Sequence, residues 1–221
     1  QPNQAVVDFI VEFEGREVAV YQPGISAAFA AAMLDEVIAI GCRKFVACGG
    51  AGVLDGTIDP GHIIVLTSAV RDEGASYHYM PPSREVGASE EGVAAIERVL
   101  RERGRPYTVG KTWTTDAFYR ETPDKVALRR SEGCVTVEME AAAFFAVARF
   151  RGVTFAQMLY GGDDVSGAEW DDREWLSWTN WWTTPRSARA RPPSTTRPRS
   201  ASSSPCASTS RAESFWTKVL M

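Results

Sequence analysis

Carboxylates and glycines stand at three points of this chain, and each point adjoins a short apolar run. The run Val137–Ala143 carries two glutamates two residues apart, at what we expect to be the start of an apolar helix. Gly161–Asp164 follows the strand-like run Thr154–Tyr160, and Gly49–Gly52 follows the strand-like run Lys44–Cys48. In α/β proteins, ligands bind at the carboxyl ends of strands, where such residues gather. These three segments therefore predict a small-molecule site.

The elements that must position these residues alternate between strand and helix patterns. Phe9, Val11 and Phe13 fall on one face of the segment 7–13, which predicts a half-buried strand. Strands are predicted at 7–13, 17–21, 44–48, 62–69, 107–113 and 154–160. Helices are predicted from the N-cap Ser26 to Ile40, from the N-cap Ser89 to Gly104, from Pro123 onward and over 138–151. Loops are predicted at 71–84 and 116–122. This alternation favours an α/β fold of three layers, with a mixed, mostly parallel sheet between helices.

The bulk composition restricts the class of protein. With 221 residues, 44% of them apolar, the chain is long enough for a domain with a buried core, and its net charge of −4 argues against a nucleic-acid binder. No apolar run reaches about 18 residues, so we expect no membrane helix, and the first residues lack the pattern of a signal peptide. The four cysteines have neither metal nor disulfide spacing, which favours free thiols in the cytoplasm.

The composition changes near the end of the chain. We expect residues 1–176 to form the domain and residues 177–221 to form a tail rich in Ser, Thr, Pro and Arg, with Glu213 as its single acid. Such a segment buries too little apolar surface to offset its ordering entropy, which predicts disorder. A basic tail with tryptophans is also a possible contact for nucleic acid or membrane. The interpretation we prefer is a segment translated out of frame after about Leu176.

From about Glu17 to Asp164 the chain resembles the nucleoside phosphorylase-I family, and its uridine phosphorylase branch most. The resemblance rests on V-E-M-E-A-A at 137–142, V-R-D-E-G-A-S at 70–76, T-D-A-F-Y at 115–119 and the two glycine segments. It implies reversible phosphorolysis of a nucleoside to base and ribose 1-phosphate, with orthophosphate as co-substrate and neither a metal nor an organic cofactor. It also implies a homo-oligomer built from dimers, in which the neighbouring subunit completes the site.

The resemblance assigns roles to the acidic residues. Glu140 would hold the two ribose hydroxyls, since a carboxylate can accept two hydrogen bonds at once, while Met139 packs on the sugar and Glu138 lines the same site. Asp163 would protonate the leaving base, as an aspartate does in the family's purine branch, and Asp164 would share a raised pKa with it if the two lie close. The alternatives are acids that complement a helix dipole and an aspartate pair in a polar turn.

The glycine segment departs from the family at two positions. Gly50, Ala51 and Gly52 align with the loop whose backbone N–H groups bind phosphate, a role that glycine favours because it lets an anion approach closely. However, Gly50 stands where the family has a Ser or Thr hydroxyl, and Ala47 stands where it has an arginine. A tight strand-to-helix turn is the alternative interpretation of these glycines.

The remaining assignments concern the base. Phe118 would stack on it, with ordinary core packing as the alternative. In uridine phosphorylases a Gln and an Arg form hydrogen bonds to the edge of uracil. This chain has Thr122 and Asp124 or Lys125 at those positions, so the identity of the base is not assigned. Arg71 and the segment after it would form a wall of the pocket.

Two other functions stay open. A nucleosidase of the same fold would use water in place of phosphate, which the residues at Ala47 and Gly50 allow. An inactive nucleoside-binding remnant is the second alternative, because the family's opening strand would lie before Gln1 and its closing helix would lie where the tail stands. His78 is not expected to be a catalytic base, and a Rossmann cofactor enzyme is disfavoured because no G-x-G-x-x-G follows a strand.

Overall fold

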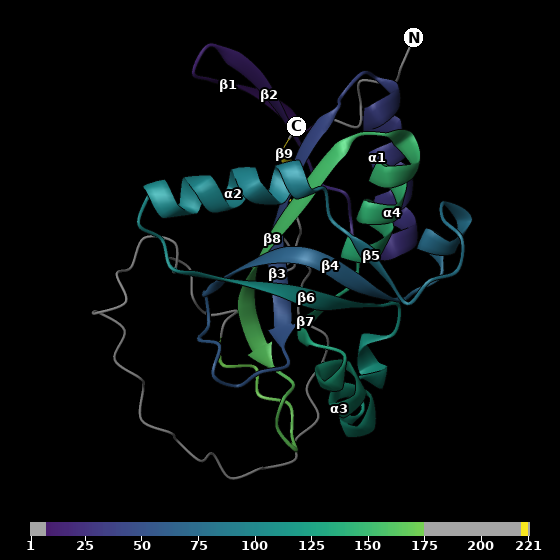
Figure 1. The fold of residues 1–221 in the computed structure, drawn as a ribbon, viewed down its shortest axis with the longest axis vertical. Coiled ribbons are helices and arrows are strands. Elements are labelled where there is room, and N and C mark those ends of the chain that lie inside the picture. The colour runs from purple at the N-terminus through teal and green to yellow at the C-terminus, as the bar shows by residue number, and fades with distance from the viewer. Residues whose placement is uncertain (1–7, 175–217, 221) are drawn as a thin grey trace, which may run out of the picture.

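The computed structural model describes residues 8–174 and 218–220, through which one mixed sheet runs (Figure 1). Its strands are β1 (Phe9–Phe13), β2 (Arg16–Tyr21), β3 (Lys44–Val53), β4 (Ile63–Asp72), β5 (Glu85–Gly87), β6 (Tyr107–Thr115), β7 (Cys134–Glu138), β8 (Thr154–Asp164) and β9 (Lys218–Leu220). The helices are α1 (Ala27–Ala39), α2 (Glu90–Glu102), α3 (Pro123–Ser131) and α4 (Ala141–Arg151), with the 3₁₀ turns η2 (Ala75–His78) and η3 (Phe118–Arg120). The predicted tail 177–221 lies outside the described residues except for β9, which pairs with β2 and β3.

The sheet is mixed, as predicted. Its longest parallel registers join β3 to β8 and β4 to β6, and β6 also pairs in parallel with β7. The antiparallel pairs include β3 with β7 and β4 with β8. Strands β3, β7, β6, β4 and β8 therefore pair in a closed circuit, which brings segments distant in the sequence to one end of the sheet. In particular, Gly52 of β3 lies opposite Val137 of β7.

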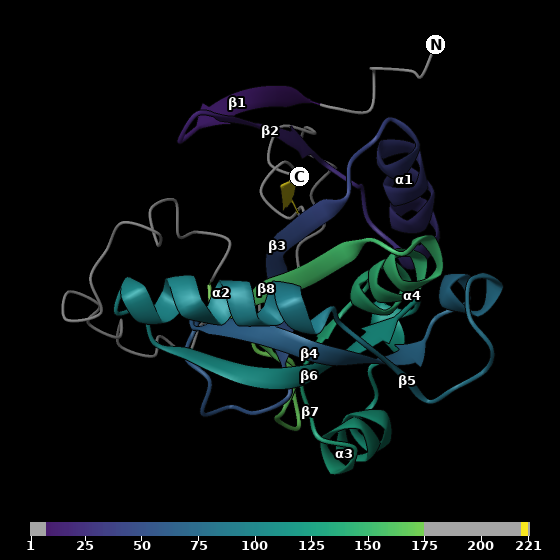
Figure 2. The same ribbon diagram turned by 45° about the horizontal axis from the view of Figure 1, so that its top comes forward.

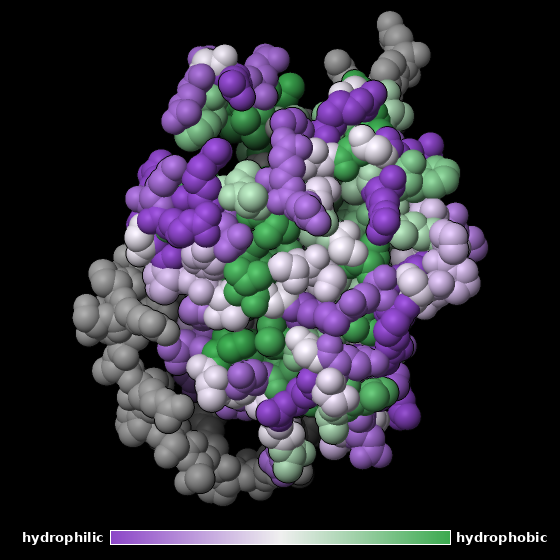
Figure 3. Space-filling view, in the orientation of Figure 1, coloured by the Kyte–Doolittle hydropathy of each residue, from purple (hydrophilic) through white to green (hydrophobic). Residues whose placement is uncertain are grey.

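Helices cover both faces of this sheet, as the three-layer prediction requires. Alternate residues of a strand point to opposite faces, and in β8 Phe155 packs in the core under α1 and α4, whereas Ala156 packs with Ile96 and Leu100 of α2. Helices α1 and α4 lie side by side, and α2 lies apart from them (Figure 2). The outward side of α2 is mainly hydrophilic (Figure 3). Within the described residues, no helix has the length and apolarity needed to cross a membrane.

The prediction of a half-buried strand at 7–13 is wrong about burial. Strand β1 forms, but Phe9, Ile10, Val11 and Phe13 are 40–62% exposed. The reason is tertiary: β1 pairs with β2 in a hairpin that extends away from the helical layers (Figures 1 and 2), so neither of its faces is covered by described residues.

The strands around the predicted site are longer than the sequence indicates. Strand β3 continues through the glycines at 49–52, which were predicted to form a loop or turn, because its pairing with β8 is continuous from Lys44 to Ala51. A Cβ at Gly50 would lie 2.9 Å from Cζ of Tyr160, and one at Gly161 would lie 3.1 Å from the carbonyl oxygen of Asp59. Here the glycines permit close packing between neighbouring segments instead of a turn.

The expected helix at 138–151 begins three residues later than predicted. Residues Cys134–Glu138 form strand β7, which pairs with β6 and β3, and α4 starts at Ala141. The strand was missed because it is short and enters directly from Gly133, whose φ of 85° ends the preceding helical segment. Gly152 ends α4 in the left-handed conformation with φ 66°, as predicted.

Candidate active site

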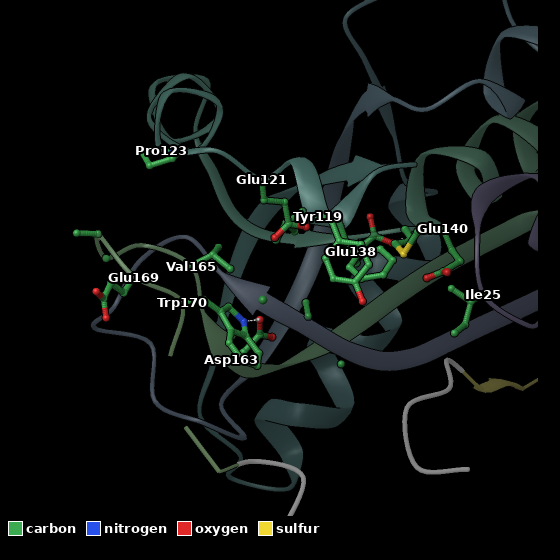
Figure 4. A pocket seen from close by; sticks show the side chains of 18 of the residues that line it. Ile25, Tyr119, Glu121, Pro123, Glu138, Glu140, Asp163, Val165, Glu169 and Trp170 are labelled. Carbon is green, nitrogen blue, oxygen red and sulfur yellow. Dashed lines mark hydrogen bonds between the residues drawn. The ribbon is translucent and has the colours of Figure 1, made fainter. Parts of the chain in front are cut away.

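A cavity of about 730 Å³ lies where the ends of β3, β7 and β8 meet the segment before α3 (Figure 4). Every residue predicted for the site except Arg71 lines it: Gly50, Ala51, Gly52, Phe118, Glu138, Met139, Glu140 and Asp163. The other lining residues are Gly24, Ile25, Tyr119, Glu121, Pro123, Val137, Val165, Gly167, Ala168, Glu169 and Trp170. The three segments that suggested a small-molecule site are thus brought together around one cavity.

Glu138, the last residue of β7, holds the start of α4. Its Oε1 accepts a hydrogen bond from Thr114 Oγ1 at 2.6 Å, and its Oε2 accepts from the backbone N–H groups of Glu140 and Ala141 at 2.8 and 2.7 Å. Thr114 Oγ1 also accepts from the N–H of Ala142 at 2.9 Å. The first N–H groups of a helix lack partners within the helix. The carboxylate of Glu138 therefore supplies hydrogen-bond acceptors to backbone N–H groups at the start of α4, which agrees with the alternative interpretation of an acid at a helix start.

Glu140 occupies the N-cap position of α4 but bonds elsewhere. Its Oε1 accepts a hydrogen bond from the backbone N–H of Ser26 at 2.8 Å, across the cavity wall at the start of α1. Ser26 has a φ of 91°, an unusual conformation for a residue with a side chain. Glu140 is only 6% exposed, yet it lines the cavity. A carboxylate offers about four acceptor positions, so Glu140 keeps acceptor capacity for a ligand.

The carboxyl groups of Glu138 and Glu140 lie close enough for the charge of one to act on the other. Burial raises the pKa of both carboxyl groups, and the charge of Glu140 raises the pKa of Glu138 further. The hydrogen bonds from Thr114 and from the α4 backbone act in the opposite direction at Glu138, because they stabilise its carboxylate. Hydrogen-bond donors on a ligand would likewise stabilise the carboxylate form of Glu140. The site is therefore prepared for a group that donates hydrogen bonds.

Asp163 lies in β8, near its end, and not in a turn after the strand. Its Oδ2 accepts a hydrogen bond from Trp170 Nε1 at 2.6 Å (Figure 4), and burial nevertheless raises its pKa. Its neighbour Asp164 differs: burial alone would raise its pKa, but hydrogen bonds from Ser166 and Arg173 lower it overall. The prediction that the two aspartates share a raised pKa is wrong, because the ion pair with Arg173 keeps Asp164 ionised.

The cavity residues that were not predicted from the sequence include one acid and two aromatic residues whose contacts are described here. Glu121 lies between η3 and α3, where burial and the nearby charge of Asp163 raise its pKa to about 7. Tyr119 contacts Phe118 with ring centroids 4.1 Å apart, and Trp170 comes from the segment after β8. An acid and aromatic residues in the run 118–121 were a signal, but only the fold reveals that Glu121 lies close to Asp163.

The glycine segment contributes backbone, and no side chain, to the cavity floor. The ring of Tyr160 occupies the space that a hydroxyl-bearing side chain at position 50 would need, since a Cβ there would lie 2.9 Å from its Cζ. Ala47 is fully buried. The two departures from the family pattern therefore leave this part of the cavity without the side chains that bind phosphate in the family.

The structure does not bring Arg71 to the cavity. The residue lies in β4 and is 2% exposed, and its guanidinium donates hydrogen bonds to Ser76 Oγ at 2.8 Å and to Pro81 O and Ser83 Oγ at 2.7 Å. These bonds fix the segment after β4. His78, in the same segment, is exposed and does not line the cavity either.

The charged side chains that line the cavity are all acidic: Glu121, Glu138, Glu140, Asp163 and Glu169. In the part of the chain that the structure describes, no Arg, Lys or His belongs to the lining. Over the same residues, no group of three His, Cys, Asp or Glu side chains has a geometry suited to a metal ion. Such a cavity favours ligands that donate hydrogen bonds and disfavours anions.

The fold and the cavity define an α/β protein with an acidic cavity at the ends of its strands. Residues 6–190 match the family model described as the Phosphorylase superfamily, so the chain belongs to this superfamily. The resemblance to the nucleoside phosphorylase-I family is thereby confirmed.

Individual relatives extend this result. The chain is 30% identical over 141 residues to a guanosine phosphorylase from Halorubrum lacusprofundi, which covers 64% of this chain and 58% of that protein. It is 27% identical over 156 residues to the uridine phosphorylase of Escherichia coli, which covers 64% of this chain and 62% of that protein. The chain thus spans about three fifths of the length of these relatives.

The same fold occurs in a solved structure. Purine nucleoside phosphorylase from Toxoplasma gondii, in complex with immucillin-H, superimposes with a TM-score of 0.67 at 21% sequence identity, covering 71% of this chain and 64% of that one. This similarity establishes the fold alone.

Proposed function

We propose that this protein is a nucleoside phosphorylase, which transfers the ribosyl group of a nucleoside from its base to orthophosphate. The observation that carries the proposal is the placing of Glu140 and Asp163 in one cavity, with Glu140 beside the start of α1 and Asp163 near the end of β8 (Figure 4). The superfamily match and the names of the relatives support the reaction class.

Glu140 binds the ribose in this proposal. Breaking the bond between ribose and base produces a sugar with oxocarbenium character, and a carboxylate that accepts bonds from the two ribose hydroxyls stabilises that positive charge. Ser26 N–H fixes the Glu140 side chain, so it needs no reorganisation during the reaction. Met139 lies next to it in the cavity lining and packs against the sugar.

Asp163 assists departure of the base. A purine leaves more easily once a ring nitrogen accepts a proton, and a carboxylic acid can supply that proton; burial raises the pKa of Asp163, which favours its protonated form. Phe118 contributes an aromatic face on which the base can stack. Orthophosphate then attacks the anomeric carbon, which yields the free base and ribose 1-phosphate.

The proposed enzyme is a homo-oligomer in which a second copy completes the site. Orthophosphate carries negative charge, whereas every charged side chain in the described lining is acidic. Backbone N–H groups at the floor, around Gly50 and Gly52, are one source of donors for the anion. A cationic residue from a neighbouring copy is the other source, and the proposal predicts that it is needed.

A nucleosidase is the second candidate. Ala47 and Gly50 lack the arginine and the hydroxyl of the phosphate site, and the ring of Tyr160 packs against Gly50 where that hydroxyl would stand. Water is uncharged, so the acidic side chains of the cavity do not repel it as they would repel phosphate. Hydrolysis would yield the base and free ribose.

One experiment distinguishes the candidates. Purine and pyrimidine nucleosides are incubated with the protein in phosphate-free buffer and in buffer with added orthophosphate, and base, ribose and ribose 1-phosphate are quantified. Base release that requires phosphate, with ribose 1-phosphate in equal amount, supports phosphorolysis. Equal base release in both buffers, with free ribose, supports the nucleosidase. Nucleoside binding without release of any base would mean that the chain is a binder only.

A further inference from the structure

The connection from β2 to α1 forms the end of the cavity where Glu140 lies. Gly24 and Ile25 of this connection line the cavity, and Figure 4 shows Ile25 and Glu140 at the end away from Asp163. The backbone N–H of Ser26, the last residue before α1, donates a hydrogen bond to Glu140 Oε1 at 2.8 Å. The path of the chain through this connection therefore helps to place the carboxylate of Glu140.

Two residues of the connection have a positive φ. Gly24 has a φ of 76°, which suits glycine, whereas Ser26 has a φ of 91° and a ψ of 145°. A residue with a Cβ rarely adopts this conformation, and it does so only where the surrounding structure imposes it. The Ser26 side chain gives no compensation, since it makes no capping hydrogen bond to α1 within the described residues. The contacts that impose the strain must therefore come from its neighbours.

One of these contacts is the ring of Phe29, in the first turn of α1. The ring lies against Gly24, where an added Cβ would be 2.3 Å from Cδ1 of Phe29. Phe29 is nevertheless 53% exposed and does not line the cavity, so its ring acts on the connection more than on the core. The other contacts are the bond to Glu140 and the bond from Ala30 N–H to Ser26 O at 3.0 Å.

We propose that Phe29 is a positioning residue for Glu140, because its ring holds Gly24 so that the strained Ser26 presents its N–H to the carboxylate. Without the ring, Ser26 relaxes toward a negative φ, and this rotation turns the peptide that carries its N–H relative to α1. Glu140 then loses the orientation that it needs for the two ribose hydroxyls. This inference rests on the proposed function, since it explains how the residue assigned to the ribose is held.

The test is a cycle of substitutions at two positions. Phe29→Ala is made in the wild type, in Ser26→Ala and in Ser26→Gly. Alanine keeps the strain because it has a Cβ, whereas glycine removes it. Dissociation constants are measured in phosphate-free buffer for inosine and uridine and for their bases, hypoxanthine and uracil, and kcat/KM is measured for cleavage. Phe150→Ala, at another exposed ring outside the cavity lining, is the matched control.

In the wild-type background, Phe29→Ala should weaken nucleoside binding by about 5- to 100-fold, because strain of this kind lowers the population of the binding-competent connection by that factor. Binding of the free bases should change by less than about twofold, since they lack the ribose. The loss should persist in Ser26→Ala and largely disappear in Ser26→Gly. Phe150→Ala should bind like the wild type. Phe29→Leu keeps part of the contact, so its loss should be smaller, and it replaces Phe29→Ala if that variant does not fold.

The positioning role and the proposed function can fail separately. If nucleosides are cleaved, the absence of a loss in Phe29→Ala, or a loss of equal size in all three backgrounds or for nucleosides and bases alike, would overturn the positioning role alone. The expected pattern of binding without cleavage of any nucleoside would support the positioning role and overturn the proposed function. Absence of binding of any nucleoside by the folded wild type would overturn both.

Discussion

Replacing Glu140 by glutamine tests the ribose contact, because the structure separates its effect on activity from any effect on folding. The hydrogen bond that Glu140 accepts from Ser26 N–H survives in the mutant, since the amide keeps one acceptor oxygen. The second oxygen becomes an NH₂ group, which cannot accept from a ribose hydroxyl, and the charge that stabilises the sugar cation is lost.

The expected magnitude follows from these losses. A hydrogen bond to a charged acceptor contributes roughly 1.5–3 kcal/mol, and with the lost stabilisation of the cation we expect about 2–4 kcal/mol in the transition state. That corresponds to a decrease of about 30- to 1000-fold in kcat/KM. The free energy of unfolding should not fall, because the mutation removes a buried charge that repels Glu138.

Glu138→Gln is the control at the same strand-to-helix junction. Glu138 accepts from Thr114 Oγ1 as well as from the backbone N–H groups of Glu140 and Ala141. An amide can serve the two backbone groups but then presents NH₂ to the threonine hydroxyl. Leaving that buried donor without an acceptor should cost about 1–3 kcal/mol of stability, or a few degrees in Tm for a protein of this size.

The assay therefore has two readouts for each variant. Steady-state cleavage of the nucleoside that the wild type accepts gives kcat/KM, and thermal unfolding followed by circular dichroism gives Tm. Glu140→Gln should lose activity with its Tm maintained, while Glu138→Gln should lose Tm. A folded Glu140→Gln variant with the kcat/KM of the wild type would refute the assignment of Glu140 to the ribose.

Three further predictions concern other positions of the site. Asp163→Asn should lower cleavage of natural purine nucleosides by roughly 10²–10⁴-fold but spare a nitrophenyl riboside, whose leaving group needs no proton; small, equal effects on both substrates would make Asp163 a structural residue. Gly50→Ala should destabilise the protein by about 1–3 kcal/mol in urea unfolding, because its Cβ would lie 2.9 Å from Cζ of Tyr160, and unchanged stability would show that the ring yields. Burial and the charge of Asp163 raise the pKa of Glu121 from the ordinary 4.5 to about 7, so the folded state holds the proton more tightly than the unfolded state. The free energy of unfolding of the wild type should therefore fall by up to about 3 kcal/mol as pH rises from about 4.5 to about 7. Glu121→Gln should lack this loss, and parallel pH profiles for the two proteins would contradict the burial of that carboxyl group.

The sequence by itself determined the elements whose patterns are local. Alternation in 17–21, the apolar run at 44–48 and the N-cap positions at Ser26 and Ser89 predicted strands and helices that the structure contains. Their order along the chain predicted the three-layer α/β fold. The motif V-E-M-E-A-A with its flanks indicated the family, because a set of residue types at fixed spacing is visible in one dimension.

Only the tertiary structure decided what each chemical group does. Glu138 and Glu140 stand only two residues apart, and the sequence does not show what either carboxylate contacts within the protein. The closed circuit of strands places Thr114 beside Glu138 and the start of α1 beside Glu140, so one carboxylate is engaged by the protein and the other keeps capacity for a ligand. Likewise, Glu121 and Asp163 are 42 residues apart and interact only because the segment before α3 folds against the end of β8. Hydrogen-bond partners and shared charge depend on distances between segments far apart in the chain, and neither composition nor periodicity contains those distances.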